Sequence, residues 1–199
     1  MKKTIELISG DTLLIVDGKR GDIRHTSEKY AKALFHELHA DAVTINPYLG
    51  YDSVAPFLED EAKGVFLLCL TSNPGAADFQ YLTVDDKYLF EKVAEKAENW
   101  NRNGNVGLVV GGTHADDLPR IRAIAPDLPI LLPGIGTQGG DLKKSLSLGC
   151  DKKGESLLVT VSRSILYASE DLNFASLSRD VAIKMRDEIN RVRGSKGRK

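Results

Sequence analysis

A chain of 199 residues, 42% hydrophobic and 28% charged, has the length and composition of an ordinary globular protein with one substantial core. Its formal net charge of -1 gives no reason to expect nucleic acid or a membrane surface as a partner, because both require a concentrated basic surface. Cys69 and Cys150 lie far apart, so neither a disulfide nor a zinc site is indicated. The longest apolar run, Val65 to Leu70, is too short to cross a membrane. We therefore expect a cytoplasmic protein.

Short apolar runs alternate with helical patterns along the chain, which predicts βαβ units and a parallel sheet covered by helices. Most of the runs are rich in Val, Ile and Leu without alternation, as strands buried on both faces are. The six expected strands cover residues 12–17, 41–46, 65–71, 106–111, 129–132 and 157–162. Helices are expected at residues 27–38, 85–101 and 118–125, followed by a last helix with the apolar stripe Leu177, Val181, Met185 and Ile189. A single barrel-like or doubly wound domain fits this order.

Polar and glycine-rich segments directly follow five of the predicted strands. They cover residues 17–22, 46–48, 71–75, 133–140 and 162–164. In a β/α barrel the carboxyl ends of the strands share one face, and active sites are built there. Turns alone would distribute such segments over both ends of the sheet. We therefore expect the active site at the carboxyl ends.

Asp17 and Lys19 stand two residues apart where the first strand is predicted to end, so both side chains can point to the same side. A lysine flanked by carboxylates is held protonated, because nearby negative charge favours its charged form. Such a lysine can give a proton to a developing carbanion. An ordinary surface ion pair is the alternative explanation of this spacing.

The glycine-rich segment 133–140 and the Ser162-Arg163 pair follow the last two predicted strands. Glycines let backbone N–H groups approach an anion closely, and an arginine can fork onto a phosphate. Phosphate sites after the last two strands recur in β/α barrels. A plain glycine-rich turn is the alternative for the loop.

These motifs resemble those of the orotidine 5′-monophosphate decarboxylases. The segment Asp17-Gly18-Lys19-Arg20-Gly21-Asp22-Ile23 resembles the Asp-x-Lys-x-x-Asp signature of that family, in the form typical of one bacterial branch. Segments 71–75, 133–140 and 162–165 resemble the later motifs of that branch, in the same order and at similar separations. The resemblance covers roughly residues 11 to 168. It implies a TIM-type (β/α)8 barrel that converts orotidine 5′-monophosphate to uridine 5′-monophosphate and carbon dioxide in pyrimidine biosynthesis.

The resemblance also implies a role for each catalytic residue. Lys19 would donate a proton to C6 of the pyrimidine after loss of carbon dioxide, and Asp17 would lie against the substrate carboxylate. Asp22 would reach across the interface of a homodimer into the neighbour's active site. No cofactor and no metal are implied, because an array of fixed charges suffices for this chemistry.

Substrate binding is implied at eight further positions. Thr26 would meet the neighbour's ribose, Ser72 would contact the pyrimidine ring, and Gln138 with Arg163 would hold the 5′-phosphate. The other implied substrate-binding residues are Pro133, Gly136, Gly139 and Ser162.

One feature departs from the family pattern. The family's barrel carries a ribose-binding aspartate on its first strand and a second active-site lysine on its second, whereas the motif from Asp17 to Asp22 belongs to the third. Only six βα units are visible, so we predict one amino-terminally incomplete barrel domain over residues 1–193 and a basic, flexible tail over residues 194–199. There are three explanations for the missing units: a start placed too late or a partial sequence, a second polypeptide that supplies them, or a degenerate protein without activity. We favour the first.

Two other functions compete with the decarboxylase. The 3-keto-gulonate-6-phosphate decarboxylases use a similar barrel and depend on magnesium, but segments 71–75 and 138–140 argue against them. The second alternative is an inactive remnant that binds nucleotide phosphate. If the 199 residues are the whole molecule, the first and last strands should have unpaired edges, and catalysis should be severely impaired. Among the other residues, Cys69 is expected to be a small buried hydrophobe, and His114 has no partner that spacing identifies.

Overall fold

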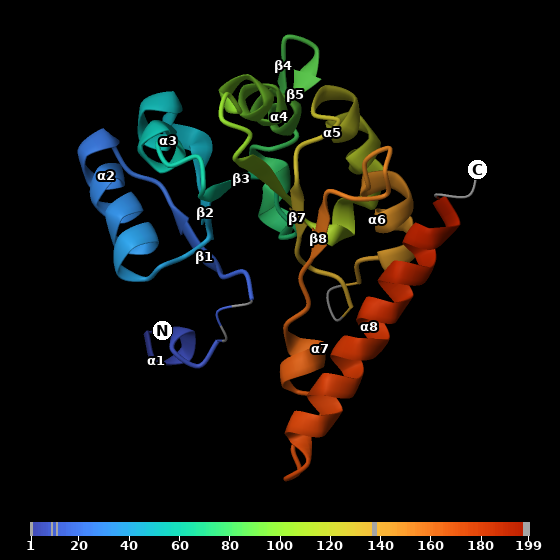
Figure 1. Ribbon diagram of the computed structural model, residues 1–199. Coiled ribbons are helices and arrows are strands. Elements are labelled where there is room, and N and C mark those ends of the chain that lie inside the picture. The colour runs from blue at the N-terminus through green and yellow to red at the C-terminus, as the bar shows by residue number, and fades with distance from the viewer. Residues whose placement is uncertain (1, 9, 11, 137–138, 197–199) are drawn as a thin grey trace.

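The chain forms one curved sheet of six parallel strands, in the order β1-β2-β3-β6-β7-β8 (Figure 1). The computed structural model describes residues 2–8, 10, 12–136 and 139–196. The strands are β1 (Ile15–Arg20), β2 (Ala42–Ile45), β3 (Gly64–Leu70), β6 (Val106–Val110), β7 (Ile130–Leu132) and β8 (Leu157–Val159). The strands of this sheet follow one another in space in the same order as along the chain, which is the arrangement of a β/α barrel. Strands β1 and β8 form the two edges.

The helices cover the face of this curved sheet that carries the main core. In Figure 1, α2 and α3 lie to the left of the sheet, and α5, α6 and α8 lie to the right. The helices are α1 (Lys2–Ile5), α2 (Arg24–Lys32), α3 (Tyr51–Leu58), α4 (Leu89–Trp100), α5 (Leu118–Ile124), α6 (Leu142–Gly149), α7 (Arg163–Leu166) and α8 (Phe174–Lys196). A π-helical turn, Ala33–Glu37, extends α2, and short 3-10 turns cover Pro47–Leu49, Pro74–Asp78 and Gly112–Asp117. No helix in the described ranges is long and apolar enough to cross a membrane.

The two faces of the sheet bury different sets of side chains. One face packs against the helices through a large core that includes the fully buried Leu67, Phe90 and Leu108. The other face carries a smaller cluster of Ala42, Phe66, Val109 and Leu131. Because alternate residues of a strand point to opposite faces, Thr44 shares this second face with Ala42.

The predicted fold class is confirmed, and most predicted strands match within a few residues. The first strand was placed wrongly: it runs over Ile15–Arg20 instead of residues 12–17, because its later residues pair with β2, where Arg20 lies opposite Ile45. The predicted helix 85–101 is also too long at its start. Lys87–Tyr88 is a strand, β5, that pairs antiparallel with β4 (Thr83–Val84), and α4 begins only at Leu89.

Helix α3 (Tyr51–Leu58), which contains Pro56, is not among the predicted helices. A proline inside a short apolar segment reads as a helix breaker, whereas tertiary packing buries Val54, Phe57 and Leu58 of this helix. Contacts with the rest of the fold therefore outweigh the local preference.

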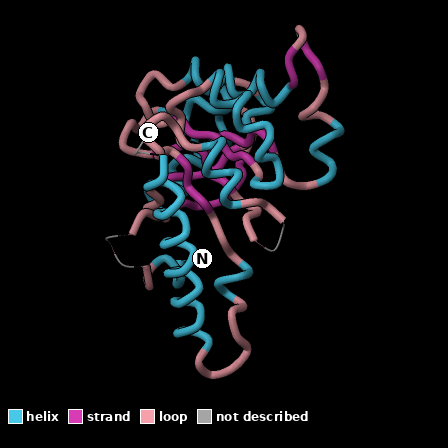
Figure 2. The backbone as a smooth tube through the Cα atoms, turned by 90° about the vertical axis from the view of Figure 1, so that its right-hand side faces the viewer, coloured by secondary structure: helices cyan, strands magenta, loops and turns pink. Residues whose placement is uncertain are grey.

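The apolar stripe of α8 is half-buried rather than fully buried. Met185 and Ile189 pack against the main core, while the first part of α8 lies beside α7 and projects beyond the sheet (Figures 1 and 2). Ser178 donates a hydrogen bond to the carbonyl of Ile165 at 2.6 Å, which fixes α7 against α8. The helix continues to Lys196, and residues 197–199 lie outside the described residues, so the proposed tail over 194–199 stays a prediction.

Arg122 of α5 joins several segments at the amino ends of β7 and β8. Its guanidinium donates hydrogen bonds to the carbonyls of Gly149 at 2.6 Å, Leu128 at 2.6 Å and Ser156 at 2.8 Å. Burial lowers the pKa of this guanidinium from its usual value, because removal from water disfavours the charged form more than nearby Asp151 favours it.

Replacing Arg122 with methionine should lower the free energy of unfolding by about 3 kcal/mol, because the buried carbonyl groups lose a charged donor. Urea denaturation would measure this loss. Arg186→Met is the matched control: the Arg186 side chain is 65% exposed and pairs with the 52% exposed Asp187 at 2.8 Å. An exposed pair of this kind contributes less than about 1 kcal/mol. Equal losses in the two variants would contradict the role of Arg122.

Candidate active site

Asp17, Lys19 and Thr44 form a single polar network where β1 and β2 approach their carboxyl ends. The Lys19 ammonium lies 2.5 Å from Asp17 Oδ2. Thr44 donates its hydroxyl proton to Asp17 Oδ1 at 2.7 Å, and the backbone N–H of Lys19 donates to Thr44 Oγ1 at 3.0 Å. The network therefore fixes both the carboxylate and the backbone that carries the lysine.

The backbone of Lys19 is strained. Its φ is 43°, in the left-handed region that residues with a side chain rarely adopt, and the pairing of β1 with β2 shifts register between Val16 and Arg20. Such a bulge redirects a side chain and is common beside active sites. Asp17 was predicted at the end of a regular strand, whereas Asp17 and Lys19 both lie inside an irregular one.

Asp17 is held in its ionised form. Its partial burial alone would raise the pKa of the carboxyl, but the hydrogen bonds from Lys19 and Thr44 and the charge of Lys19 outweigh that effect and lower the pKa. The side chains of Lys19 and Asp17 are 50% and 59% exposed, so water screens their attraction and both groups remain open to a ligand. An ammonium and a carboxylate fixed side by side can contact a reacting group of either charge.

Thr44 is the first functional residue that the sequence analysis missed. It is fully buried within β2, between the apolar Val43 and Ile45. A hydroxyl residue in an otherwise apolar strand was the available signal, but only strand pairing shows that it faces Asp17.

Asp22 and Thr26 lie at the start of α2, just beyond the bulge. Asp22 Oδ1 accepts a hydrogen bond from the backbone N–H of Ile23 at 2.8 Å, and its carbonyl accepts one from Ser27 Oγ, also at 2.8 Å. Gly21, immediately before, packs so closely on the next loop that a Cβ atom there would lie 3.1 Å from the Asn46 carbonyl oxygen. The segment is thus fixed in one chain, and a contact across a dimer stays a prediction.

The structure brings the glycine-rich loop after β7 beside the segment after β8. Gly134, Gly136 and Gly139 adopt φ values of 95°, 89° and 85°, which favour glycine. A Cβ atom on Gly136 would lie 3.1 Å from Ser164 Oγ, so this loop touches the neighbour of Arg163. Ser162 and Arg163 are exposed and Pro133 is half-buried, whereas Gln138 lies outside the described residues.

Ser72 follows β3 and lies against the end of β6. The backbone N–H of Gly111 donates to the carbonyl of Leu70 at 2.7 Å, and a Cβ atom on Gly111 would lie 2.8 Å from the Ser72 nitrogen. Two further residues that the sequence analysis missed, Gln80 and His114, hydrogen-bond Thr71, the residue before Ser72. Neither carries a sequence signal, because both reach Thr71 from loops.

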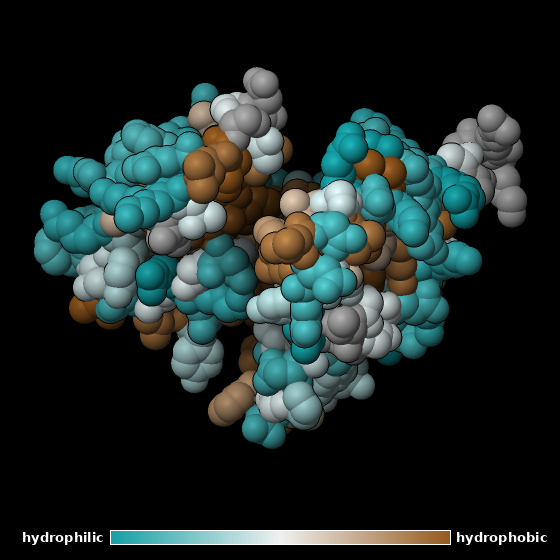
Figure 3. Space-filling model, turned by 90° about the horizontal axis from the view of Figure 1, so that it is seen from below, coloured by the Kyte–Doolittle hydropathy of each residue, from teal (hydrophilic) through white to brown (hydrophobic). Residues whose placement is uncertain are grey.

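A largely apolar hollow of about 650 Å³ lies beside the carboxyl ends of β2 and β3. Asn46 and Thr71 line it, together with Tyr48, Phe79 and Trp100, but Asp17 and Lys19 do not. Figure 3 shows a face of the molecule on which hydrophobic side chains gather along a central hollow. Within the described ranges, no group of three or more His, Cys, Asp or Glu residues could hold a metal ion. Cys69 is buried, as expected, and its thiol donates to the carbonyl of Phe90 at 3.2 Å.

The sheet order and the polar groups at its carboxyl end define a protein of the β/α-barrel type. The model of the orotidine 5′-phosphate decarboxylase / HUMPS family matches residues 2–176, and the chain belongs to this family.

Curated and solved proteins agree with this assignment. An orotidine 5′-phosphate decarboxylase of Dehalococcoides mccartyi is 48% identical over 197 residues, which are 97% of this chain and 73% of that protein. The structure of Leishmania donovani OMP decarboxylase has a TM-score of 0.85 at 43% identity and covers 96% of this chain and 73% of that one. The structure of Leishmania donovani UMP synthase has a TM-score of 0.88 at 45% identity, and the match covers 96% of this chain but only 42% of that one.

Proposed function

We propose that this chain carries the decarboxylation site of an orotidine 5′-monophosphate decarboxylase. The observation that supports this function best is the Asp17–Lys19 ion pair, at 2.5 Å on a strained bulge within the Asp-x-Lys-x-x-Asp segment. The relatives named above, 43% to 48% identical, bear the name of this activity.

Each charge in the site has a task in the reaction. The bond between C6 of the pyrimidine and its carboxylate breaks, carbon dioxide leaves, and the electron pair stays on C6. Lys19 then transfers one proton to C6, which completes uridine 5′-monophosphate and leaves the lysine neutral. Asp17 lies against the substrate carboxylate and disfavours its negative charge, which is lost as carbon dioxide departs. Fixed charges of this kind act without reorganising during the reaction.

Phosphate binding supplies free energy at a distance from the reacting carbon. The loop with Gly136 and Gly139 lies beside Ser162 and Arg163, so backbone N–H groups and a guanidinium can surround one phosphate together with Gln138. Interactions with a nonreacting part of the substrate can be used to favour the transition state.

The magnesium-dependent 3-keto-gulonate-6-phosphate decarboxylases are the enzymatic alternative. The family description covers more than one activity, so the family match alone does not separate them. The relatives at 48% and 43% identity favour the orotidine substrate. A homodimer with shared sites and a cytoplasmic location complete this proposal.

Replacing Arg163 with alanine should weaken the binding of uridine 5′-monophosphate by about 10- to 100-fold, because a hydrogen bond to a charged group contributes about 1.5 to 3 kcal/mol. Binding of uridine, which lacks the phosphate, should change by less than about 2-fold. Isothermal titration calorimetry with both ligands would measure the difference.

Arg186→Ala is the matched control, because Arg186 is an exposed arginine of α8 that pairs with its neighbour Asp187 at 2.8 Å. It should change neither affinity. Equal losses of nucleotide and nucleoside binding in Arg163→Ala would contradict the phosphate site.

A further inference from the structure

Thr71, the residue before Ser72, has its polar atoms bound by side chains from other parts of the chain. Its backbone N–H donates to Gln80 Oε1 at 2.7 Å, and its hydroxyl oxygen accepts from Gln80 Nε2 at 2.8 Å. Its carbonyl oxygen lies 3.0 Å from His114 Nε2. Backbone groups at the end of a strand usually bond to water or to the next strand, so this arrangement is a clamp on one residue.

The hydrogen positions in this clamp follow from the chemistry of its partners. A backbone carbonyl only accepts hydrogen bonds, so Nε2 of His114 carries the proton that it shares with Thr71. The other ring nitrogen, Nδ1, is then an acceptor and lies 2.9 Å from the Tyr81 hydroxyl, whose one proton is within hydrogen-bond reach of both Nδ1 and Asp117 Oδ2, the latter 2.6 Å away. Tyr81 therefore holds His114 in the orientation that reaches Thr71.

Tyr81 is itself anchored in the core. Its ring meets the fully buried Phe90 edge to face, with ring centroids 5.5 Å apart. Burial and the neighbouring Asp117 raise the pKa of Tyr81 well above its usual value, so its hydroxyl keeps its proton at neutral pH. The clamp thus extends from the hydrophobic core to Thr71 through hydrogen bonds of 2.6 to 3.0 Å.

The same clamp determines where Ser72 lies. His114 belongs to the 3-10 turn Gly112–Asp117, and Gly111, just before this turn, packs directly under the Ser72 backbone. Any side chain at Gly111 would collide with the Ser72 nitrogen, 2.8 Å from the position of a Cβ atom. One segment therefore supports Ser72 from below and holds the carbonyl of the preceding residue.

We propose that Gln80, Tyr81 and His114 are positioning residues that fix Ser72 for its contact with the pyrimidine ring. This inference rests on the proposed function, because it takes Ser72 as the residue that meets the base. The three residues act through Thr71. Their loss should therefore weaken recognition of the base and spare recognition of the ribose phosphate, which binds at the ends of β7 and β8.

The test compares two ligands that share the phosphate and differ in the base. Calorimetry on the 199-residue chain would measure the binding of uridine 5′-monophosphate and of ribose 5-phosphate. In His114→Leu, affinity for the nucleotide should fall by about 10-fold, and affinity for ribose 5-phosphate should change by less than about 2-fold. His114→Gln, which can again donate a proton from Nε2, should restore most of the nucleotide affinity.

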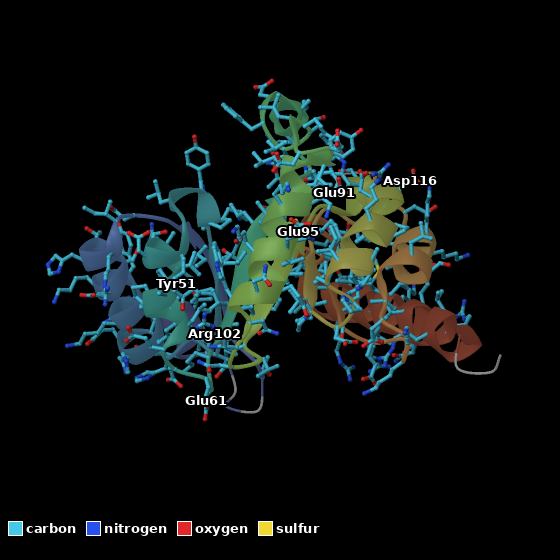
Figure 4. The ribbon with its side chains drawn as sticks, turned by 90° about the horizontal axis from the view of Figure 1, so that it is seen from above. Tyr51, Glu61, Glu91, Glu95, Arg102 and Asp116 are labelled. Atoms are coloured by element: carbon cyan, nitrogen blue, oxygen red, sulfur yellow. The ribbon has the colours of Figure 1, made fainter. Side chains whose placement is uncertain are left out.

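Tyr81→Phe keeps the aromatic packing and removes only the hydroxyl, so it should show the same selective loss at a smaller size. It also carries the test if His114→Leu unfolds, which circular dichroism would show. Two control variants should bind both ligands normally. His36→Leu replaces an exposed histidine. Tyr51→Phe removes a hydroxyl from Tyr51 of α3 (Figure 4), whose ring packs on Trp100 with centroids 5.5 Å apart.

The outcomes separate the two proposals. If the unaltered chain does not bind the nucleotide more tightly than ribose 5-phosphate, the proposed function fails and the positioning role fails with it. If the unaltered chain prefers the nucleotide, but the variants lose affinity for both ligands equally or for neither, only the positioning role is wrong. Equal losses in His114→Leu and His114→Gln would also overturn it, because the donated hydrogen bond would then have no part in binding.

Discussion

Replacing Lys19 with alanine should lower the rate of decarboxylation by about 10³-fold, because the reaction loses both its proton donor and the positive charge beside C6. Affinity for uridine 5′-monophosphate should fall far less, since Arg163 and the glycine-rich loop still hold the phosphate. The assay is release of carbon dioxide from orotidine 5′-monophosphate, compared between the unaltered protein and the variant.

Two further variants sharpen this test. Lys19→Arg keeps the positive charge, but a guanidinium does not give up its proton, so the rate should remain close to that of the alanine variant. Lys184→Ala removes an exposed lysine of α8 and should leave the rate unchanged. Full activity of Lys19→Arg would show that charge alone suffices and that the proton comes from elsewhere.

Mixing two inactive variants, Lys19→Ala and Asp22→Ala, should restore activity if active sites are shared between two subunits. In a heterodimer, one site then carries both substitutions and the other carries neither. Random exchange makes about half of the dimers heterodimers, each with one of two sites intact, so recovery should reach about one quarter of normal activity. The measurement is carbon dioxide release before and after subunit exchange.

The surface around Asp22 fits an interface. Gly21 packs against Asn46, and the next residues after Asn46 include Tyr48 and Leu49, which are 80% and 48% exposed. Large exposed apolar side chains beside a predicted shared site are typical of a contact between subunits.

The matched control for this experiment is a mixture of Lys19→Ala and Asp17→Ala. Both residues serve the site of their own chain, 2.5 Å apart, so every heterodimer site keeps one substitution and no activity should return. If exchange is complete and the mixture of Lys19→Ala and Asp22→Ala also stays inactive, Asp22 acts within its own chain.

The fold class and the order of the motifs could be predicted from local patterns in the amino-acid sequence. Buried parallel strands such as β3 and β6 consist of continuous apolar runs, because both of their faces are covered, and such runs are visible without a structure. The Asp-x-Lys-x-x-Asp segment and the glycine-rich loop are equally local, since a few residues within one stretch carry all of their chemistry. Strands and motifs of this kind can therefore be recognised from residues that are adjacent in the chain.

The contacts between these residues could not be predicted in this way, because they depend on how the whole chain folds. The bulge at Lys19 arises because β1 pairs with β2 out of register, and Thr44 joins Asp17 only through that pairing. The clamp of Gln80 and His114 on Thr71 joins residues 9 and 43 positions apart. Hydrogen bonds across such separations form when packing brings distant loops together, and packing depends on the whole chain rather than on any local pattern.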